Sequence, residues 1–448
     1  MTLIAPARGA SPRSIFRAAA FCGTWSDRQR IDPPAPGGLM RLYFYQDAAG
    51  NFGDDLNSWL WPRLIPELLD SDDGALLVGI GTLLNDRIPA APRKFVFGSG
   101  AGYGAKPRID QSWSFLCVRG PLTAAALGLP SELAVTDSAA LVNRLAVVGP
   151  KRHRVSFMPH HASKIRAEVD GLDLPRICEQ AGIHYIDPCA EPAGILAEIQ
   201  ASELVLGDAM HACIAADSLR VPWTPVRLYD HIFTFKWRDW LRSLELEYDP
   251  ADYKGEPTGE AVCEFLYDLR SCGRPRLSEA AVFDSRLERL VELVEELRER
   301  CSMPPAGHQA SRGAVAETNG KRDSAGWLRA CYSGIRELSM AVPRDSLLVL
   351  VDEDQWGAGP MVGGSRRIHF IEKEGGYWGP PADGASAVEE LRRVQRAGAG
   401  YIAFAWPAFW WFQHYEALGE YLSSRCREIL STPRVRVFKL PAEEGISA

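Results

Sequence analysis

The sequence predicts an α/β protein built from three units, and three observations support this prediction. Short apolar segments of strand length alternate with helix-like segments from Arg41 onward. Polar motifs follow several of the strand-like segments, where open α/β sheets place their ligands. The chain has 448 residues, more than one ordinary hydrophobic core accommodates. We therefore expect mostly parallel, doubly wound sheets.

The first unit is expected over residues 39–150, with Pro150 as a natural break. Its strands are predicted at 41–45, 75–79, 94–97, 115–118 and 134–136, and its helices at 54–69, 121–127 and 138–145. The pattern restarts over 151–250, with strands at 154–158, 184–186 and 204–206 and helices at 174–181, 193–201 and from Met210. Two Rossmann-like units joined by a short hinge resemble the GT-B architecture, in which the ligand lies between the units.

The remaining segments flank this pair. We expect a disordered N-terminal extension (1–38), a helical connector (251–302), a flexible linker (303–325) and a small C-terminal α/β unit (326–448). The connector contains an amphipathic helix over 277–301, for which a core-facing or self-associating role is favoured. In the last unit, strands are predicted at 346–351, 368–371, 401–406 and 435–440, and helices at 386–396 and 409–430.

Composition indicates a soluble cytoplasmic protein. A net charge of −7 gives no bulk electrostatic reason to bind nucleic acid. The longest apolar run, from Tyr401 to Phe412, is shorter than the ~20 residues that span a bilayer. The ten cysteines lack the paired spacing of a zinc site or a disulfide framework, which fits a reducing compartment.

The motif Asn51-Phe52-Gly53-Asp54 follows the first strand. Gly53 lets a loop approach a ligand, and Asn51 and Asp54 can bind hydroxyl groups. The ordinary alternative is that Asp54 caps the following helix and Asn51 forms a turn.

A glycine-rich loop with Gly98, Ser99 and Gly100 follows a buried strand. It weakly matches a dinucleotide fingerprint, but Pro107 lies where that fingerprint needs a continuing helix. An anion bound by backbone N–H groups of the loop is the favoured interpretation.

Arg119 and Asp137 each end a predicted strand. Arg119 can direct a bidentate fork at a phosphate or carboxylate, and the alternative is a surface arginine. Asp137 could orient Arg119 or cap its own helix.

Two histidine motifs end strands of the second unit. Of His160 and His161, one is expected to face the cleft, and no further ligands suggest a metal site. His211 lies one turn into a helix, with Asp208 as the expected N-cap. A histidine at a helix N-terminus can donate a proton to a bound anion or pair with that anion. The ordinary alternative is a structural histidine.

Together these motifs resemble the polysaccharide pyruvyl transferase family over residues 40–245. The matching segments are Asn51–Asp54, Gly98–Gly100, Val118–Thr123, Thr136–Ala139, Pro159-His160 and Asp208–Ile214. The resemblance implies a GT-B-like fold and an enzyme that uses phosphoenolpyruvate, without a further cofactor or metal, to form a pyruvate ketal on a sugar diol. It implies that Arg119 holds phosphoenolpyruvate and that His211 acts at the reacting centre, with Asp54 or His160 as acceptor of a hydroxyl proton. The family often has Ser-Arg-Leu-His where this chain has Asp208-Ala209-Met210-His211, so one arginine is missing.

The same resemblance implies the partners. The acceptor is expected to be a surface polysaccharide or its lipid-linked precursor at the inner face of the membrane, beside membrane-bound polysaccharide-synthesis enzymes. A homo-oligomer is left open.

The C-terminal unit resembles a small α/β domain attached to bacterial glycosyltransferases. Matching residues include Gly375-Gly376-Tyr377, Pro381–Asp383 and Ala408–Trp411. Its Trp406, Trp410, Trp411 and Tyr415 could stack on sugars, although a core role is the more ordinary one.

Two other functions remain open at this point. One is a GT-B glycosyltransferase that uses a nucleotide sugar. The other is a glycan-binding scaffold that has lost activity.

Overall fold

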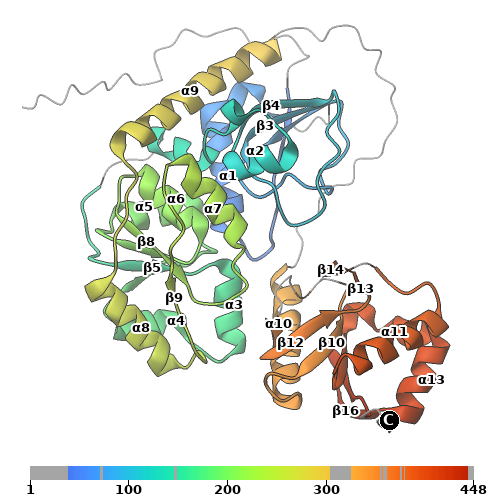
Figure 1. Ribbon diagram of the computed structural model, residues 1–448. Helices are drawn as coiled ribbons and strands as arrows, with labels where there is room; N and C mark the ends of the chain where they lie inside the picture. Colours follow the sequence, from blue (N-terminus) through green and yellow to red (C-terminus); the bar gives the residue numbers. More distant parts are fainter. Residues whose placement is uncertain are drawn as a thin grey trace, which may run out of the picture.

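The computed structural model describes residues 39–70, 74–145, 149–302, 324–353, 356, 361–373, 376–377 and 379–441. The predicted extension at 1–38 and nearly all of the predicted linker lie outside the described residues. Figure 1 shows three α/β units, of which the C-terminal one lies beside helix α3. The α/β class is confirmed, whereas the GT-B arrangement and the domain boundaries stay predictions. None of the described helices is both long and apolar enough to cross a membrane.

The first sheet has four parallel strands in the order β1-β2-β3-β4. They are β1 (Arg41–Tyr43), β2 (Ala75–Val78), β3 (Arg93–Ser99) and β4 (Trp113–Val118). Helices α1 (Phe52–Leu64) and α2 (Pro121–Leu127) and the 3-10 helix η4 (Ser138–Arg144) belong to this unit. The strand predicted at 134–136 is wrong, because only Ala134 bridges to Val118. The helix predicted to reach residue 69 ends early, since Pro66 begins a separate 3-10 turn.

The second sheet is parallel, with the order β6-β5-β7-β8-β9. Its strands are β5 (Ser156–Met158), β6 (His184–Tyr185), β7 (Val205–Gly207), β8 (Trp223–Arg227) and β9 (Ala251–Asp252). The chain moves from β5 to one neighbour and then crosses to β7 on the other side. The carboxyl ends of β5 and β7 therefore flank a topological switch point, the usual ligand position in such sheets.

Six helices accompany the second sheet, and two of them are not predicted by the sequence pattern. They are α3 (His161–Val169), α4 (Leu174–Gln180), α5 (Pro192–Gln200), α6 (Met210–Ser218), α7 (Thr234–Ser243) and α8 (Gly259–Cys272). The two unpredicted helices are α3 and α7, whereas α8 lies within the predicted helical connector. Helix α7 packs on α2 and so reaches back to the first unit.

Helix α9 (Ala280–Ser302) lies along the first unit in Figure 1 and contacts β4 and η4. Its residues Leu287, Leu290, Leu293, Val294 and Leu297 are buried, so the core-facing prediction is confirmed. They belong to a hydrophobic core that contains residues from both parallel sheets and from α7. The two units are thus joined by continuous apolar packing.

The C-terminal unit is a six-stranded mixed sheet in the order β11-β12-β10-β15-β17-β16. Its elements are α10 (Ser324–Ala341), β10 (Leu347–Val351), β11 (Met361–Val362), β12 (Ser365–His369), α11 (Gly384–Arg396), β15 (Tyr401–Ala405), α12 (Trp411–His414), α13 (Glu416–Arg425), β16 (Arg427–Ser431) and β17 (Val435–Lys439). A short hairpin, β13 (Glu372–Lys373) with β14 (Gly376–Tyr377), stands apart from this sheet. The helix predicted over 409–430 is wrong at its end, because 427–431 form an edge strand antiparallel to β17. Trp411 and Tyr415 are core residues, whereas Trp410 is 41% exposed.

Candidate active site

The motifs around Gly53 and His211 touch each other. A Cβ atom added to Gly53 would lie 2.2 Å from Nδ1 of His211, so no larger residue fits there without displacing the imidazole. Gly53 lies in the first turn of α1 and His211 in the first turn of α6, and these helices pack together. Two segments that are distant in sequence therefore meet at the carboxyl edges of the two sheets.

His211 is paired with Asp137. Its Nε2 lies 3.6 Å from Oδ2 of Asp137, and neither atom has a hydrogen-bond partner among the described residues. The other carboxylate oxygen accepts a hydrogen bond of 2.9 Å from the amide of Ala139, so the predicted capping role of Asp137 is confirmed. A buried carboxylate beside one ring nitrogen orients the imidazole, which leaves Nδ1 as the nitrogen for proton transfer.

Arg119 is completely buried, so the alternative of a surface arginine is wrong. Its Nε donates to Oδ2 of Asp239 at 3.2 Å, and its Nη1 donates to Oγ1 of Thr82 at 3.0 Å. Its Nη2 is buried and has no hydrogen-bond partner among the described residues. Gly100 makes room for this guanidinium, because an added Cβ would lie 2.0 Å from Nη2. Asp239 of α7, and not Asp137, orients the arginine.

The glycine loop uses two of its amides in internal hydrogen bonds. The amide of Gly100 donates to the carbonyl of Gly81 at 2.9 Å, and the amide of Ala101 donates to Oγ1 of Thr123 at 3.1 Å. The hydroxyl of Ser99 donates to the same Gly81 carbonyl at 3.1 Å. The amides of Gly100 and Ala101 are therefore not free to bind an anion, whereas anion binding by the other amides of the loop stays a prediction.

Gly98 serves the His211 side of the site. It has φ +74°, and an added Cβ would lie 2.4 Å from the amide nitrogen of Ser138, next to Asp137. Residues 100–112 form no helix, which a dinucleotide-binding turn requires, so the dinucleotide interpretation is wrong.

Lys236 is the main site residue that the sequence pattern did not reveal. It lies on α7 and is 8% exposed, and its ammonium group makes no hydrogen bond or ion pair with the described residues. The nitrogen is 5.8 Å from the ring centroid of Tyr103 in the glycine loop. Its charge acts on Asp54 and on the histidine cluster described below, which places it inside the site. A lone lysine in an aromatic-rich helix offers no motif, and its role is visible only from its burial.

Asp54 has an unusually weakly acidic carboxyl group. Burial raises its pKa to about 7, against the opposing effect of the Lys236 charge. The Nδ2 of Asn51 donates to Oδ2 of Asp54 at 2.5 Å. The capping alternative for Asp54 is wrong, because Asn51 occupies the N-cap position of α1 and Asp54 lies in its first turn. A carboxyl with a pKa near neutrality suits proton exchange with a sugar hydroxyl.

Asp208 is a structural anchor and not the N-cap of α6, which is Ala209. Its two oxygens accept hydrogen bonds from the amides of His160 at 2.9 Å and Leu228 at 3.1 Å. The carboxylate therefore ties the loop after β5 to the end of β8 and fixes the backbone at the switch point.

His160, His161 and His231 form a cluster of neutral imidazoles beside this anchor. Burial lowers the pKa of His160 well below its usual value, that of His161 to about 4 and that of His231 to about 3. The ring centroid of His160 lies 4.5 Å from that of His161 and 5.9 Å from that of His231. Nδ1 of His160 accepts a hydrogen bond from the amide of Ala162 at 3.2 Å, which leaves the proton of the neutral ring on Nε2. His160 can thus donate to a substrate oxygen, and Asp54 becomes the better acceptor of a hydroxyl proton.

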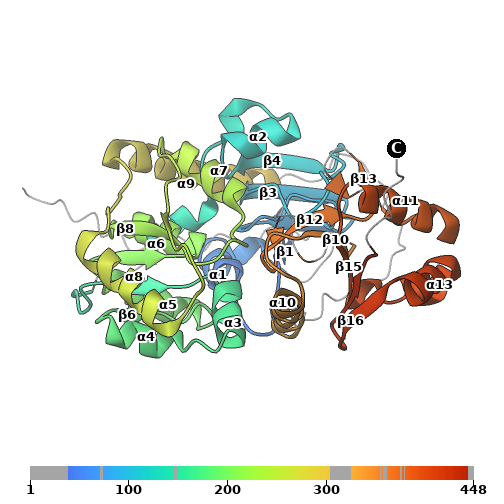
Figure 2. The same ribbon diagram turned by 60° about the horizontal axis from the view of Figure 1, so that its bottom comes forward.

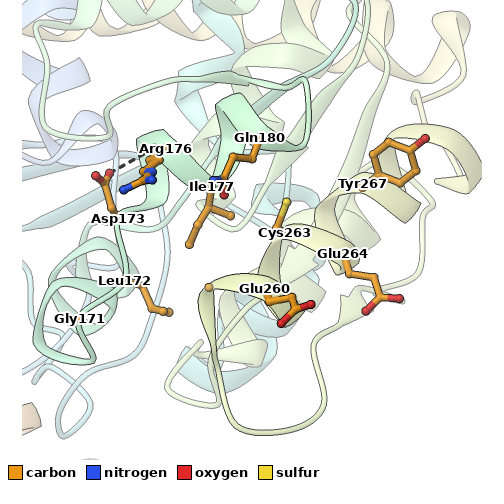
Figure 3. A pocket seen from close by; sticks show the side chains of 11 residues that line it. Gly171, Leu172, Asp173, Arg176, Ile177, Gln180, Glu260, Cys263, Glu264 and Tyr267 are labelled. Carbon is orange, nitrogen blue, oxygen red and sulfur yellow. Dashed lines mark hydrogen bonds between the residues drawn. The ribbon is translucent and has the colours of Figure 1, made fainter.

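Two further observations limit what the site can do. Within the described part of the chain, no three His, Cys, Asp or Glu side chains converge as metal ligands. A surface hollow of about 760 Å³ between α4 and α8 is lined by residues such as Arg176, Cys263 and Tyr267 and contains none of the predicted site residues (Figure 3). The hollow therefore lies apart from the predicted site residues.

Comparison with known proteins agrees with this constellation. The family model for polysaccharide pyruvyl transferase matches residues 29–231, which contain every predicted site residue but end before α7. The succinoglycan biosynthesis protein ExoV of Rhizobium meliloti (strain 1021) is 43% identical over 228 residues, which are 50% of this chain and 71% of that protein. The proposed relationship of the C-terminal unit to glycosyltransferase-associated domains stays a prediction. The chain belongs to the polysaccharide pyruvyl transferase family and is an enzyme that transfers a pyruvyl group to a polysaccharide.

Proposed function

We propose that phosphoenolpyruvate is the donor and that it binds between Arg119 and Lys236, without a further cofactor. The observation that carries this proposal is a pair of cationic side chains at the site: Arg119, whose buried Nη2 has no hydrogen-bond partner among the described residues, and the buried Lys236, which forms no ion pair with them. Phosphoenolpyruvate carries a phosphate and a carboxylate, so two cations match its two anionic groups. A buried cation without a partner is costly, and a bound anion removes that cost.

The reaction assigns a task to each neighbouring group. His211 donates a proton to the methylene carbon of phosphoenolpyruvate, whose double-bond electrons form the new C–H bond of a methyl group. The first sugar hydroxyl adds to the resulting cationic carbon, and Asp54 accepts its proton. The C–O bond to phosphate then breaks, and the phosphate leaves with the bonding electrons, stabilised by Arg119 and Lys236.

The second hydroxyl closes the ketal ring and loses its proton. The products are the pyruvate ketal and inorganic phosphate. Of the two hydroxyl protons, the one accepted by Asp54 is passed on to His211 and the other leaves with phosphate, so both residues return to their starting states. Proton transfers of this kind contribute on the order of 10²–10⁴-fold in rate.

The name of the bacterial relative supports an exopolysaccharide acceptor. We propose that the acceptor is such a polysaccharide or its lipid-linked precursor, and that the enzyme works at the cytoplasmic face of the membrane beside the enzymes that assemble it.

Calorimetry with phosphoenolpyruvate tests the donor assignment. We expect saturable binding by the wild-type protein and weaker binding by Arg119→Lys, because an ammonium group cannot contact Asp239, Thr82 and the ligand together. His211→Gln should retain binding and lose turnover, since His211 acts on the methylene carbon. Absence of binding at millimolar phosphoenolpyruvate, together with tight binding of a nucleoside diphosphate, would instead identify a nucleotide-sugar glycosyltransferase.

A further inference from the structure

Helix α10 of the C-terminal unit is buried on two faces. One face carries Cys331 and Leu338, which pack with Val342 against the unit's own sheet. The other face carries Ala325, Leu328, Tyr332 and Ile335, which pack against Ala162, Ile165 and Val169 of α3. Both ribbon views show α10 alongside α3 (Figures 1 and 2). The second face would be an exposed apolar stripe if the C-terminal unit moved away from α3.

Polar contacts at the edges fix one docked orientation. Arg329 pairs with Glu168 at 2.6 Å, and Nη1 of Arg336 donates to the carbonyl of Val169. Arg344 forms an ion pair with Glu256, beyond the end of α10. Exposed pairs of this kind each contribute little, so the apolar stripe supplies the affinity and the charges supply the register.

The docked helix reaches the histidine cluster. Tyr332 is 7% exposed, and its ring centroid lies 5.8 Å from that of His231. The guanidinium carbon of Arg166 lies 5.3 Å from the Tyr332 ring and 5.7 Å from the Tyr229 ring, so the three side chains form a continuous stack. On the other side, Nε2 of His231 lies 3.3 Å from Oγ of Ser163, one turn from His160 on α3.

We propose that the C-terminal unit forms part of the acceptor side of the active site, with Tyr332 as a positioning residue for His231 and for the first turn of α3. This inference rests on the proposed function, because it assigns the histidine cluster to the sugar acceptor. The donor groups Arg119 and Lys236 follow β4 and lie on α7, whereas α10 packs on α3. Lys236 also acts on His231 through its charge, so we expect loss of the docked helix to affect the acceptor strongly and donor binding little.

The pKa of His231 shows whether α10 is docked on α3. The groups that face it are His160 and His161 from the β5–α3 turn, Ser163 and Arg166 from α3, Tyr229 from its own loop, Lys236 from α7 and Tyr332 from α10. Burial is the main cause of its low pKa, and Tyr332 covers it. Removing the Tyr332 ring admits water and moves the pKa of His231 upward toward the ordinary histidine range.

The test compares four full-length variants with the wild type. Tyr332→Ala removes the ring, Tyr332→Phe keeps it, Arg329→Glu opposes Glu168, and Arg425→Glu is a matched charge reversal at an exposed position on α13. Three quantities are measured for each: the Kd for phosphoenolpyruvate, the ring titration of the histidines by NMR, and kcat/KM with methyl β-D-glucopyranoside as a small sugar acceptor.

For Tyr332→Ala we expect a raised His231 pKa, a phosphoenolpyruvate Kd within about twofold of wild type, and a fall in kcat/KM on the order of 10–100-fold. In Arg329→Glu, the His231 pKa should also rise and kcat/KM should also fall. Tyr332→Phe and Arg425→Glu should resemble the wild type in all three quantities. An unchanged His231 titration in Tyr332→Ala, or an equal loss of donor affinity, overturns the inference. If the wild type itself fails to bind phosphoenolpyruvate, the donor proposal fails, while the histidine titration still decides whether α10 is docked.

Discussion

Lys236 is a buried lysine that forms no close ion pair within the described part of the chain, and burying a cation without such a pair lowers the stability of a folded protein. We predict that Lys236→Met raises the melting temperature of the ligand-free enzyme, because methionine has similar length and no charge to desolvate. The same variant should lose the stabilisation that phosphoenolpyruvate gives to the wild type. Thermal unfolding with and without the ligand measures both effects.

Lys254→Met is the matched control, since Lys254 is exposed. It should leave both melting temperatures unchanged. A Lys236→Met protein that is less stable than wild type in the absence of ligand would show that the ammonium has an internal partner.

The raised pKa of Asp54 predicts how the free energy of unfolding changes with pH. Its pKa rises from 3.8 to about 7 on folding, so the folded state binds this proton more tightly than the unfolded chain between those values. The contribution of Asp54 to the free energy of unfolding is therefore full below pH 3.8 and is lost as the pH rises to about 7. Urea unfolding between pH 4 and 8 should show this decline in the wild type and a smaller one in Asp54→Asn.

Activity responds in the opposite sense, because the base form of Asp54 accepts the hydroxyl proton. In the wild type, kcat/KM should rise with pH through the pKa of Asp54, which is about 7. Asp54→Asn should lack this limb and be slower by on the order of 10²–10⁴-fold. A rising limb that persists in the variant would assign the base to another group.

At the residue scale, the sequence was sufficient where polar groups sit in short motifs after strands. Arg119, Asp137, His160 and His211 were identified in this way, and the structure brings Asp137 to His211. The sequence did not reveal Asp239, whose carboxylate accepts a hydrogen bond from Arg119 although the two residues are 120 positions apart. Such a pairing depends on how α7 packs across the first unit, which no local pattern records.

Among the elements, α9 packs against η4, the 3-10 helix that begins after Asp137. Leu290 is completely buried in the core that α9 forms with η4, the helix that Asp137 caps. We predict that Leu290→Ala lowers the free energy of unfolding by about 2–5 kcal/mol, because it leaves a cavity in a packed core. Denaturant unfolding measures the change.

The comparison for this element is Leu277→Ala. Leu277 precedes α9 and is 36% exposed, so Leu277→Ala should lower the free energy of unfolding much less than Leu290→Ala. Equal costs at the two positions would contradict the core-facing role of α9.

A helix or strand is predictable when local sequence signals mark it, and it is missed when its packing partner is distant in the sequence. Helices α2 and α6 begin at the predicted residues, Pro121 and Met210, because a proline at the first position or a preceding strand marks them. Helix α3 was missed, since its short stripe of Ala162, Ile165 and Val169 is completed by α10 from a distant segment. The strand at 427–431 was read as helix because its pairing with β17 is an edge contact with mixed polarity.

For the whole molecule, the shared core predicts joint unfolding of the two parallel sheets. Residues from β3, α6, α7 and α9 belong to one apolar cluster, so neither sheet can open without exposing the other. We predict that amides of β3 and β7 exchange hydrogen with the same free energy of opening. Native-state exchange at low denaturant measures this, and a separate, lower opening energy for β7 would show two independent domains.

Helix α7 also has a consequence for enzyme engineering. One helical turn carries both Lys236 and Asp239, yet it lies beyond residue 231, where the match to the family model ends. A chimera that grafts residues 29–231 onto a foreign C-terminal half would inherit Arg119 without the carboxylate that orients it and without the second cation. A chimera made to exchange acceptor specificity between relatives should therefore have its junction after Ser243, at the end of α7. All residues of the proposed anion site then come from the same parent protein.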